Sequence, residues 1–222
     1  MYFKIHKDGW VFIISAFIIS FITFPFFQII SIFFAILGFF IIYFFRDPNR
    51  SIPIEDFIVS PADGKIVYIG ESNLPDELGI TGDYLKISIF LDVFNVHVNR
   101  IPVSGNIKKI TYIPGKFFRA NVDKASKENE RNIILLENKN KEKIVVVQIA
   151  GLIARRIVCE LKNNQSVLKG DRFGMIKFGS RVDLYLPKNY LPLVSKDQIV
   201  IAGETIISNP NEIKKISKSQ EI

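Results

Sequence analysis

The sequence predicts a mainly β fold, a β-rich α+β arrangement. A compact domain of sandwich- or barrel-like antiparallel sheets should follow an N-terminal hydrophobic helical hairpin. The segment from Val11 to Phe45 contains no charged residue. From Phe57 onward, short β-branched runs are bounded by Gly, Pro, Asn and Asp, which is typical of strands joined by turns. The 222 residues suffice for one such domain and an appendage.

The uncharged segment is a candidate membrane segment, since about 18 or more consecutive apolar residues indicate one. It exceeds the length of a single span. Pro25 and Gln28 lie near its middle, where proline would break one continuous helix. We therefore expect two helices joined around Pro25–Gln28. Each is short for a full crossing, so the sequence leaves open both a hairpin that dips into the bilayer and two crossings.

Basic residues flank this segment at both ends: Lys4 and Lys7 precede it, and Arg46 and Arg50 follow it. Since Lys and Arg mark the cytoplasmic side of a membrane, we expect both ends at the cytoplasmic face of the cell membrane. A secretory signal peptide is the alternative, but its apolar core would have about 7–15 residues followed by a small-residue cleavage site. The longer segment here favours an anchor.

The composition restricts the partners. The formal net charge is +7, of which residues 1–50 carry +2 and the rest +5. A basic chain suits an anionic membrane surface or nucleic acid. Since no nucleic-acid-binding motif is present, we expect lipid and no nucleic acid. The single cysteine, Cys159, rules out an intrachain disulfide. With one Cys and two His, we expect no metal site of the usual zinc kind.

Composition divides the chain into four parts. We expect a membrane anchor at residues 1–46, a linker at 47–56, a catalytic β domain at 57–208 that packs without the apolar run, and a polar tail at 209–222. Residues 115–131 are too polar for a core strand and predict a long loop. The expected strands cover residues 65–69, 84–90, 93–101, 132–136, 144–149, 153–161 and 181–186.

Three polar residues have unusual settings. Ser180 follows Gly179 between two strand-like runs, where glycine marks a bulge or a close backbone approach; a surface serine beside a bulge is the simpler interpretation. His97 lies on the polar face of the strand expected at 93–101, as an ordinary exposed histidine also would. Asp63 precedes a glycine, and this pair is first of all a turn.

Together, these residues suggest a hydroxyl activated by a base that a carboxylate orients. A serine hydrolase would need the pattern Gly-x-Ser-x-Gly around its nucleophile. Arg181 and Val182 follow Ser180, and no second glycine comes. A serine hydrolase is therefore disfavoured. Activation of the Ser180 hydroxyl by a base remains compatible with the sequence.

Four motifs in order give the chain a specific resemblance to a known family. They are SPADG at 60–64, FLDVFNVHVNR at 90–100, the segment from PGKF at 114–117 to NER at 129–131, and RFGMIKFGSRVD at 172–183. In these the chain resembles the phosphatidylserine decarboxylase proenzymes, and its FGSR sequence matches the short-form (class A) members. The longer members carry LGST there and a second histidine near the position of His97, and neither occurs in this chain.

The resemblance implies a self-cleaving, pyruvoyl-dependent enzyme that converts phosphatidylserine to phosphatidylethanolamine and CO2 in phospholipid biosynthesis. Ser180 would attack the carbonyl of Gly179. Cleavage would give a β chain (1–179) and an α chain (180–222) whose pyruvoyl cap derives from Ser180. This covalent cofactor would form a Schiff base with the substrate amine. His97 would act as the base, and Asp63 would orient it.

Several alternatives stay open at the level of sequence. The short-form class includes enzymes acting on archaetidylserine, so the lipid backbone is not fixed. A membrane-anchored lipid-binding module without catalysis is a rival function. Arg155 and Arg156 are candidates for binding the lipid phosphate, because guanidinium groups match phosphate geometry; a solvated basic pair fits the sequence at least equally well. We expect the α and β chains to stay together and leave a homo-oligomer open.

Overall fold

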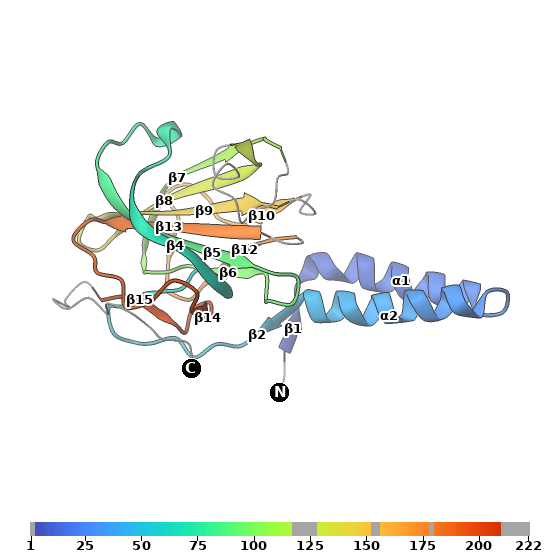
Figure 1. The fold of residues 1–222 in the computed structure, drawn as a ribbon. Helices are drawn as coiled ribbons and strands as arrows, with labels where there is room; N and C mark the ends of the chain where they lie inside the picture. The colour runs from blue at the N-terminus through green and yellow to red at the C-terminus, as the bar shows by residue number, and fades with distance from the viewer. Residues whose placement is uncertain (1–2, 117–127, 152–155, 178–179, 210–222) are drawn as a thin grey trace.

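The computed structural model describes residues 3–116, 128–151, 156–177 and 180–209. The predicted fold class is confirmed: a helical hairpin projects from one end of a β-rich body (Figure 1). The hairpin consists of α1 (Trp10–Thr23) and α2 (Gln28–Phe44). The predicted break is also confirmed, because α1 ends just before Pro25.

The two helices of the hairpin contact each other mainly through apolar side chains. One polar contact joins them, since the hydroxyls of Ser20 and Ser31 each donate to the other residue's carbonyl, at 2.8 and 2.7 Å. The helices approach closely at Gly38, where an added Cβ would lie 2.9 Å from the ring of Phe17. Within the described ranges, neither helix combines the length and hydropathy needed to cross a membrane.

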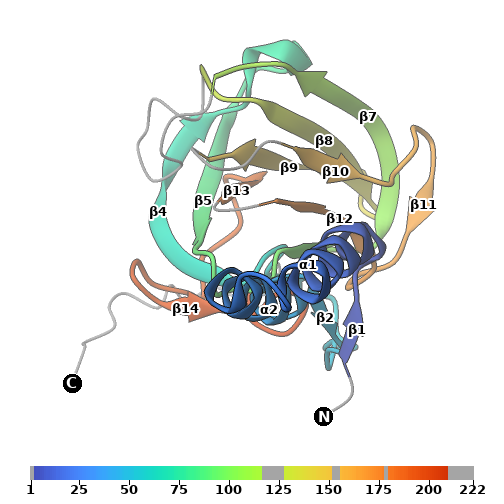
Figure 2. The same cartoon turned by 90° about the vertical axis from the view of Figure 1, so that its right-hand side faces the viewer.

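Eight antiparallel strands form one curled sheet in the order β11-β7-β8-β9-β13-β5-β4-β14, and Figure 2 shows its curvature. Three shorter strands form a second sheet in the order β10-β12-β6, and β1–β2 and β3–β15 are isolated pairs. The strands of the curled sheet are β4 (Gly64–Asn73), β5 (Asp83–Leu91), β7 (Gly105–Ile113), β8 (Arg131–Asn138), β9 (Lys143–Ala150), β11 (Ser166–Val167), β13 (Ser180–Pro187) and β14 (Ile199–Val200). The remaining elements are β1 (Phe3–Ile5), η1 (Lys7–Gly9), β2 (Arg46–Pro48), β3 (Ile58–Val59), η2 (Asp76–Leu78), β6 (Val98–Arg100), β10 (Ile157–Cys159), β12 (Arg172–Ile176) and β15 (Ile206–Ser208).

Both faces of the curled sheet are packed, which explains the continuous apolar runs in its central strands. On the inner face, Val182 and Leu184 of β13 join the main core with Phe173 of β12. On the outer face, Tyr185 joins a second core with Leu74. Strands β8 and β9 contribute side chains to both cores.

Several expected strands are confirmed with longer bounds, but β7 was not predicted from the sequence. A bulge between Ile107 and Lys109 interrupts its pairing with β8. The bulge separates the inward residues Ile107 and Ile110 by three positions, which hides the two-residue alternation of a strand. The expected loop at 115–131 lies largely outside the described residues, as do residues 153–155 of the expected strand at 153–161, of which β10 is the described part.

The predicted division between anchor, linker and β domain stays a prediction, but the base of the hairpin contacts the β domain. Phe44 and Phe45 at the base of the hairpin are buried and share a core cluster with Met175 of β12. The expected linker begins within β2, which pairs with β1, and Asp47 of that strand is buried. Hydrophobic residues at the hairpin base therefore pack against β12, whereas the two core clusters of the curled sheet contain no hairpin residue among those described. Residues 210–222 of the expected tail lie outside the described residues.

Candidate active site

Ser180 is the first residue of the central strand β13. It is paired with Leu91 of β5 on one side and with Ala150 of β9 on the other. Its side chain is fully buried, and within the described structure its Oγ has no hydrogen-bond partner. Because an unpaired buried hydroxyl is costly, this position calls for a chemical explanation. Gly179 lies outside the described residues.

His97 is buried rather than placed on the polar face of a strand. The strand expected at 93–101 is only Val98–Arg100, and a turn at Asp92–Asn95 precedes it. The two-residue alternation therefore fails before β6. The imidazole packs against the ring of Phe44, with 4.2 Å between ring centroids. The base of the hairpin thus forms one wall around His97.

The surroundings of His97 determine which ring nitrogen carries the hydrogen. Its Nδ1 lies 3.0 Å from the carbonyl oxygen of Asn95, which can only accept, so Nδ1 carries the hydrogen of this bond. Nε2 is then an acceptor, and it has no partner among the described residues. Burial lowers the pKa of His97 to about 4. The imidazole is therefore neutral at neutral pH and available to receive a proton.

A chain of buried amides lies beside these groups. Gln148 of β9 donates to Asn99 Oδ1 at 2.9 Å and accepts from Asn132 of β8 at 3.0 Å. Asn99 Nδ2 is buried and lacks a partner within the described ranges. This chain of amides was not predicted from the sequence, although Gln148 is the one polar residue in the run from Ile144 to Ala150.

Backbone pairing places these unpaired atoms around one region of the fold. Asn99 of β6 is opposite Gly174 of β12, and Gln148 is opposite Val182 of β13. The segment that joins β12 to β13 contains the expected cleavage point just before Ser180. Among the described residues, three buried polar atoms therefore lack a partner near the ends of these paired strands: the Ser180 hydroxyl at the start of β13, the Asn99 amide in β6 and the His97 imidazole just before β6.

Asp63 does not hydrogen-bond to His97. Its Oδ2 accepts from Arg50 Nη2 at 2.7 Å and its Oδ1 from the backbone N–H of Ala202 at 2.8 Å. Burial raises the pKa of Asp63, against the opposing effects of Arg50 and of the Ala202 N–H. The Asn95 carbonyl holds His97 in place of the expected carboxylate. Asp63 instead joins the chain after β2 to the turn before β15.

The structure describes only one of the two arginines predicted to bind the lipid phosphate. Arg155 lies outside the described residues, and Arg156 is solvent-exposed just before β10. The backbone carbonyl of Arg156 accepts from the N–H of Lys177, at 3.2 Å. Their role in phosphate binding stays a prediction.

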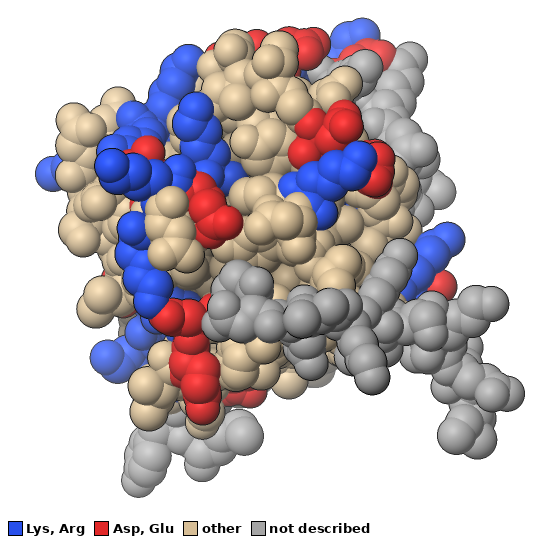
Figure 3. Space-filling view, turned by 90° about the vertical axis from the view of Figure 1, so that its left-hand side faces the viewer, with Lys and Arg blue, Asp and Glu red and all other residues tan. Residues whose placement is uncertain are grey.

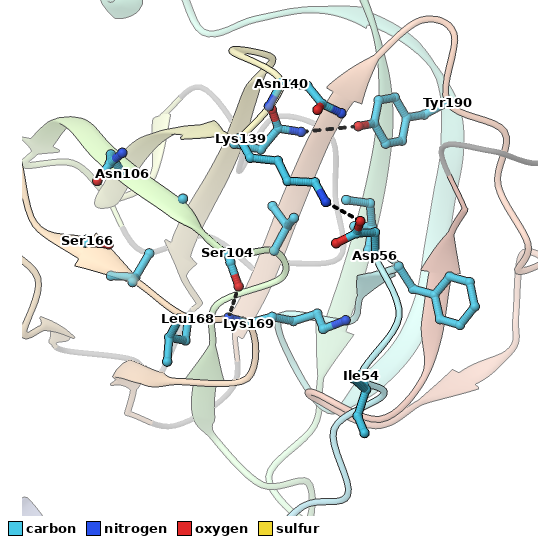
Figure 4. Close-up of a pocket in the computed structure, with 16 residues that line it drawn as sticks. Ile54, Asp56, Ser104, Asn106, Lys139, Asn140, Ser166, Leu168, Lys169 and Tyr190 are labelled. Carbon is cyan, nitrogen blue, oxygen red and sulfur yellow. Dashed lines mark hydrogen bonds and ion pairs between the residues drawn. The ribbon is translucent and has the colours of Figure 1, made fainter.

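A cavity of about 310 Å³ lies elsewhere, between the β7–β11 edge and the turn after β8 (Figure 4). Lys139 reaches into it to pair with Asp56, and the backbone N–H of Lys169 donates to Ser104 Oγ at 2.9 Å. Neither Ser180 nor His97 lines this cavity. We therefore do not assign it to the chemistry of Ser180, since the unpaired reactive atoms lie elsewhere.

Comparisons with known proteins agree with this geometry. The family model described as phosphatidylserine decarboxylase matches residues 37–208. The phosphatidylserine decarboxylase proenzymes of Rickettsia typhi, Rickettsia prowazekii and Rickettsia conorii are each 51% identical to the chain over 208 residues, covering 92% of this chain and 90% of each relative. The match includes the hairpin base, His97 and Ser180. The chain therefore belongs to the phosphatidylserine decarboxylase family, a family of decarboxylases.

Proposed function

We propose that this chain is a self-cleaving, pyruvoyl-dependent proenzyme that decarboxylates phosphatidylserine to phosphatidylethanolamine. The buried hydroxyl of Ser180 at the start of β13, which has no hydrogen-bond partner among the described residues, carries the proposal. A buried serine with a purely structural role would bond to a neighbour, as Ser208 does to the Leu191 carbonyl at 2.7 Å. Ser180 is instead poised at the point where the relatives' name, proenzyme, implies cleavage.

In the first step, Ser180 Oγ gives its proton to an acceptor and attacks the carbonyl carbon of Gly179. The neutral Nε2 of His97 is such an acceptor. The peptide bond between the two residues breaks as an ester forms, and the nitrogen of residue 180 takes up a proton. Elimination across the Cα–Cβ bond of Ser180 then releases chain 1–179 as a carboxylate. The remaining dehydroalanine takes up water and loses ammonia, which leaves a pyruvoyl group on the N-terminus of residue 181.

The residues around Ser180 fit such a group. A ketoacyl cap presents carbonyl oxygens that accept hydrogen bonds, and Asn99 Nδ2 is a buried donor without a described partner. The paired strands β5 and β9 would hold the new chain end in the sheet after cleavage. When present, the pyruvoyl group supplies an acceptor for the electrons that decarboxylation leaves on the substrate.

The hairpin supplies the membrane attachment in this proposal. Its outward side chains are large and apolar, and Arg46 and Arg50 follow it. We place the enzyme at the cytoplasmic face of the cell membrane, where anionic lipids attract basic residues. Separate measurements of turnover on phosphatidylserine and on archaetidylserine would distinguish the two possible lipid backbones. Exposed Arg156 is the described candidate for the substrate phosphate.

Intact mass of the purified protein tests the maturation. The parent should give two chains, 1–179 and a pyruvoyl-capped chain that starts at residue 180, and the smaller chain should resist Edman degradation. Ser180→Ala should give one uncut chain because no hydroxyl remains. Ser208→Ala, which also loses a buried hydroxyl, should be cut as usual. Cleavage of Ser180→Ala, or a free serine at the new N-terminus, would show ordinary proteolysis and overturn the proposal.

The same measurement separates the roles of His97 and Asp63. His97→Ala should accumulate precursor, because it removes the proton acceptor. Asp63→Asn should slow cleavage less, because Asp63 contacts Arg50 and Ala202 rather than the imidazole. Normal cleavage in His97→Ala would leave this histidine a structural role only.

A further inference from the structure

The β-rich body carries an exposed aromatic residue where it meets the hairpin. Phe94 is 62% exposed at the tip of the Asp92–Asn95 turn, three residues before His97. Its ring lies edge-on to Phe40 of α2, with 6.5 Å between centroids. Nearby Tyr43 is also exposed, so the apolar surface of the hairpin continues onto the turn that precedes His97.

Most backbone polar groups of this turn are already bonded to protein groups, namely those of Asp92, Phe94 and Asn95. The N–H of Phe94 donates to Asp92 Oδ1 at 2.7 Å, and its carbonyl accepts from Tyr43 Oη at 3.1 Å and from Arg46 Nη2 at 2.7 Å. The Asp92 N–H donates to Asn95 Oδ1 at 2.9 Å. A segment whose polar backbone groups are bonded internally can enter a lipid environment at low cost, whereas an unsatisfied one cannot.

The hairpin base also has the composition of a membrane interface. Trp10 begins α1 and Tyr43 lies near the end of α2, at 49% and 44% exposure. Between them the helices expose Phe and Ile. Lys7 and Arg46 lie just outside the helices. Trp and Tyr concentrate at the headgroup level of bilayers, with basic residues beyond them. The hydrogen bond from Tyr43 therefore places Phe94 at this same level.

We propose that the Asp92–Asn95 turn is a second membrane contact: Phe94 inserts at the boundary of headgroups and acyl chains. Through Tyr43 and Arg46, the inserted hairpin then fixes the depth of the turn and of the His97 that follows it. This inference rests on the proposed membrane attachment and adds a lipid-binding surface on the β-rich body.

A bilayer fits this surface better than a protein partner does. The surface is continuous with an uncharged hairpin that exposes Phe and Ile along its length. The opposite end of the molecule differs, since Figure 3 shows Lys and Arg interspersed with Asp and Glu there. Lys188, for example, pairs with Glu71 and Asp83 at that end of β13. Of the two ends, the hairpin end is therefore the one that offers lipid a wide apolar surface.

Trp fluorescence tests the proposal directly, because Trp10 is the one tryptophan of the chain. The double variant Trp10→Phe/Phe94→Trp reports on the turn alone. Trp10→Phe/Asn189→Trp is the matched control, since Asn189 lies in the exposed turn after β13, at the opposite end of that strand from Ser180. Each full-length variant is placed in vesicles of phosphatidylcholine and phosphatidylglycerol whose acyl chains are brominated near the headgroup.

The indole introduced by Phe94→Trp should have a blue-shifted emission, and the brominated lipid should quench it to an extent comparable to Trp10 in the parent. The indole introduced by Asn189→Trp should not be quenched. Quenching of Trp10 in the parent without quenching in the Phe94→Trp variant would overturn the inference and leave the anchored enzyme intact. The occurrence of self-cleavage in the same samples reports separately on the proposed function and on folding.

A second measurement covers the case in which tryptophan is not tolerated in place of Phe94. Phe94→Ser should lower the ratio of turnover on vesicles to turnover on mixed micelles by about tenfold, the change expected when burial of an aromatic side chain is lost. Asn189→Ser should leave this ratio unchanged. An unchanged ratio in Phe94→Ser would contradict the proposed contact, and a docking protein would then be the occupant to seek.

Discussion

Acid should destabilise this protein through His97, and replacing that residue with Gln should remove the effect. The imidazole is buried against Phe44 with its Nε2 unpaired among the described residues, and its pKa is lowered to about 4 from 6.5. In the unfolded chain the imidazole takes a proton near pH 6.5, whereas in the folded protein it does so only near pH 4. Stability is therefore lost as the pH falls through this window, and no further loss from His97 follows below it.

The magnitude follows from the two pKa values. Each tenfold difference in proton affinity corresponds to about 1.4 kcal/mol, so the full loss below pH 4 is about 3 kcal/mol. Between pH 7 and pH 5 it is about 2 kcal/mol, because the folded imidazole is still neutral at pH 5. The same reasoning predicts that His97 stays neutral at pH values well below 6.5. It can then still accept the proton of Ser180 during self-cleavage.

Denaturant unfolding in mild detergent measures this effect. The Ser180→Ala background keeps the protein a single chain, and His97→Gln is compared with it at pH 7 and pH 5. Carboxylates and His6 titrate in both proteins, so the difference between the two pH-dependent changes isolates His97. We expect the background to lose about 2 kcal/mol more than His97→Gln. Equal losses in the two proteins would show that His97 is not buried as a neutral group and would refute the reasoning.

Two further predictions concern the join between the hairpin and the body. Asp47→Asn should lower the free energy of unfolding by about 3 kcal/mol, since Arg100 and Arg172 share this buried carboxylate at 3.3 and 2.5 Å. Thermal unfolding measures the change, and a change under about 0.5 kcal/mol would contradict the prediction. A chain that starts at Asp47 should fail to self-cleave, because it loses Phe44 and Phe45 from their buried cluster with Met175. Two fragments on a denaturing gel would show that the β-rich body folds without these two residues.

The sequence alone determined the class of fold and the position of the hairpin. An uncharged apolar run must be buried in something, and Pro25 cannot continue a helix, so a helical hairpin follows from local chemistry. The apolar runs of β8 and β9 likewise predicted strands without knowledge of their neighbours. The four motifs pointed to Ser180 and to the family, because the order of motifs is a property of the chain itself.

Tertiary structure decided what surrounds the reactive residues. The two-residue alternation placed His97 on a polar face, but the turn at Asp92–Asn95 ends that alternation, and Phe44 from a distant segment buries the ring. Asp63 was expected to orient His97, yet Arg50 and Ala202 bind it. Local propensity arises from a residue and its near neighbours, whereas burial and hydrogen-bond partners depend on segments that only folding brings together. For this reason the sequence identified the residues that could do the chemistry, and only the packing showed which contacts hold them.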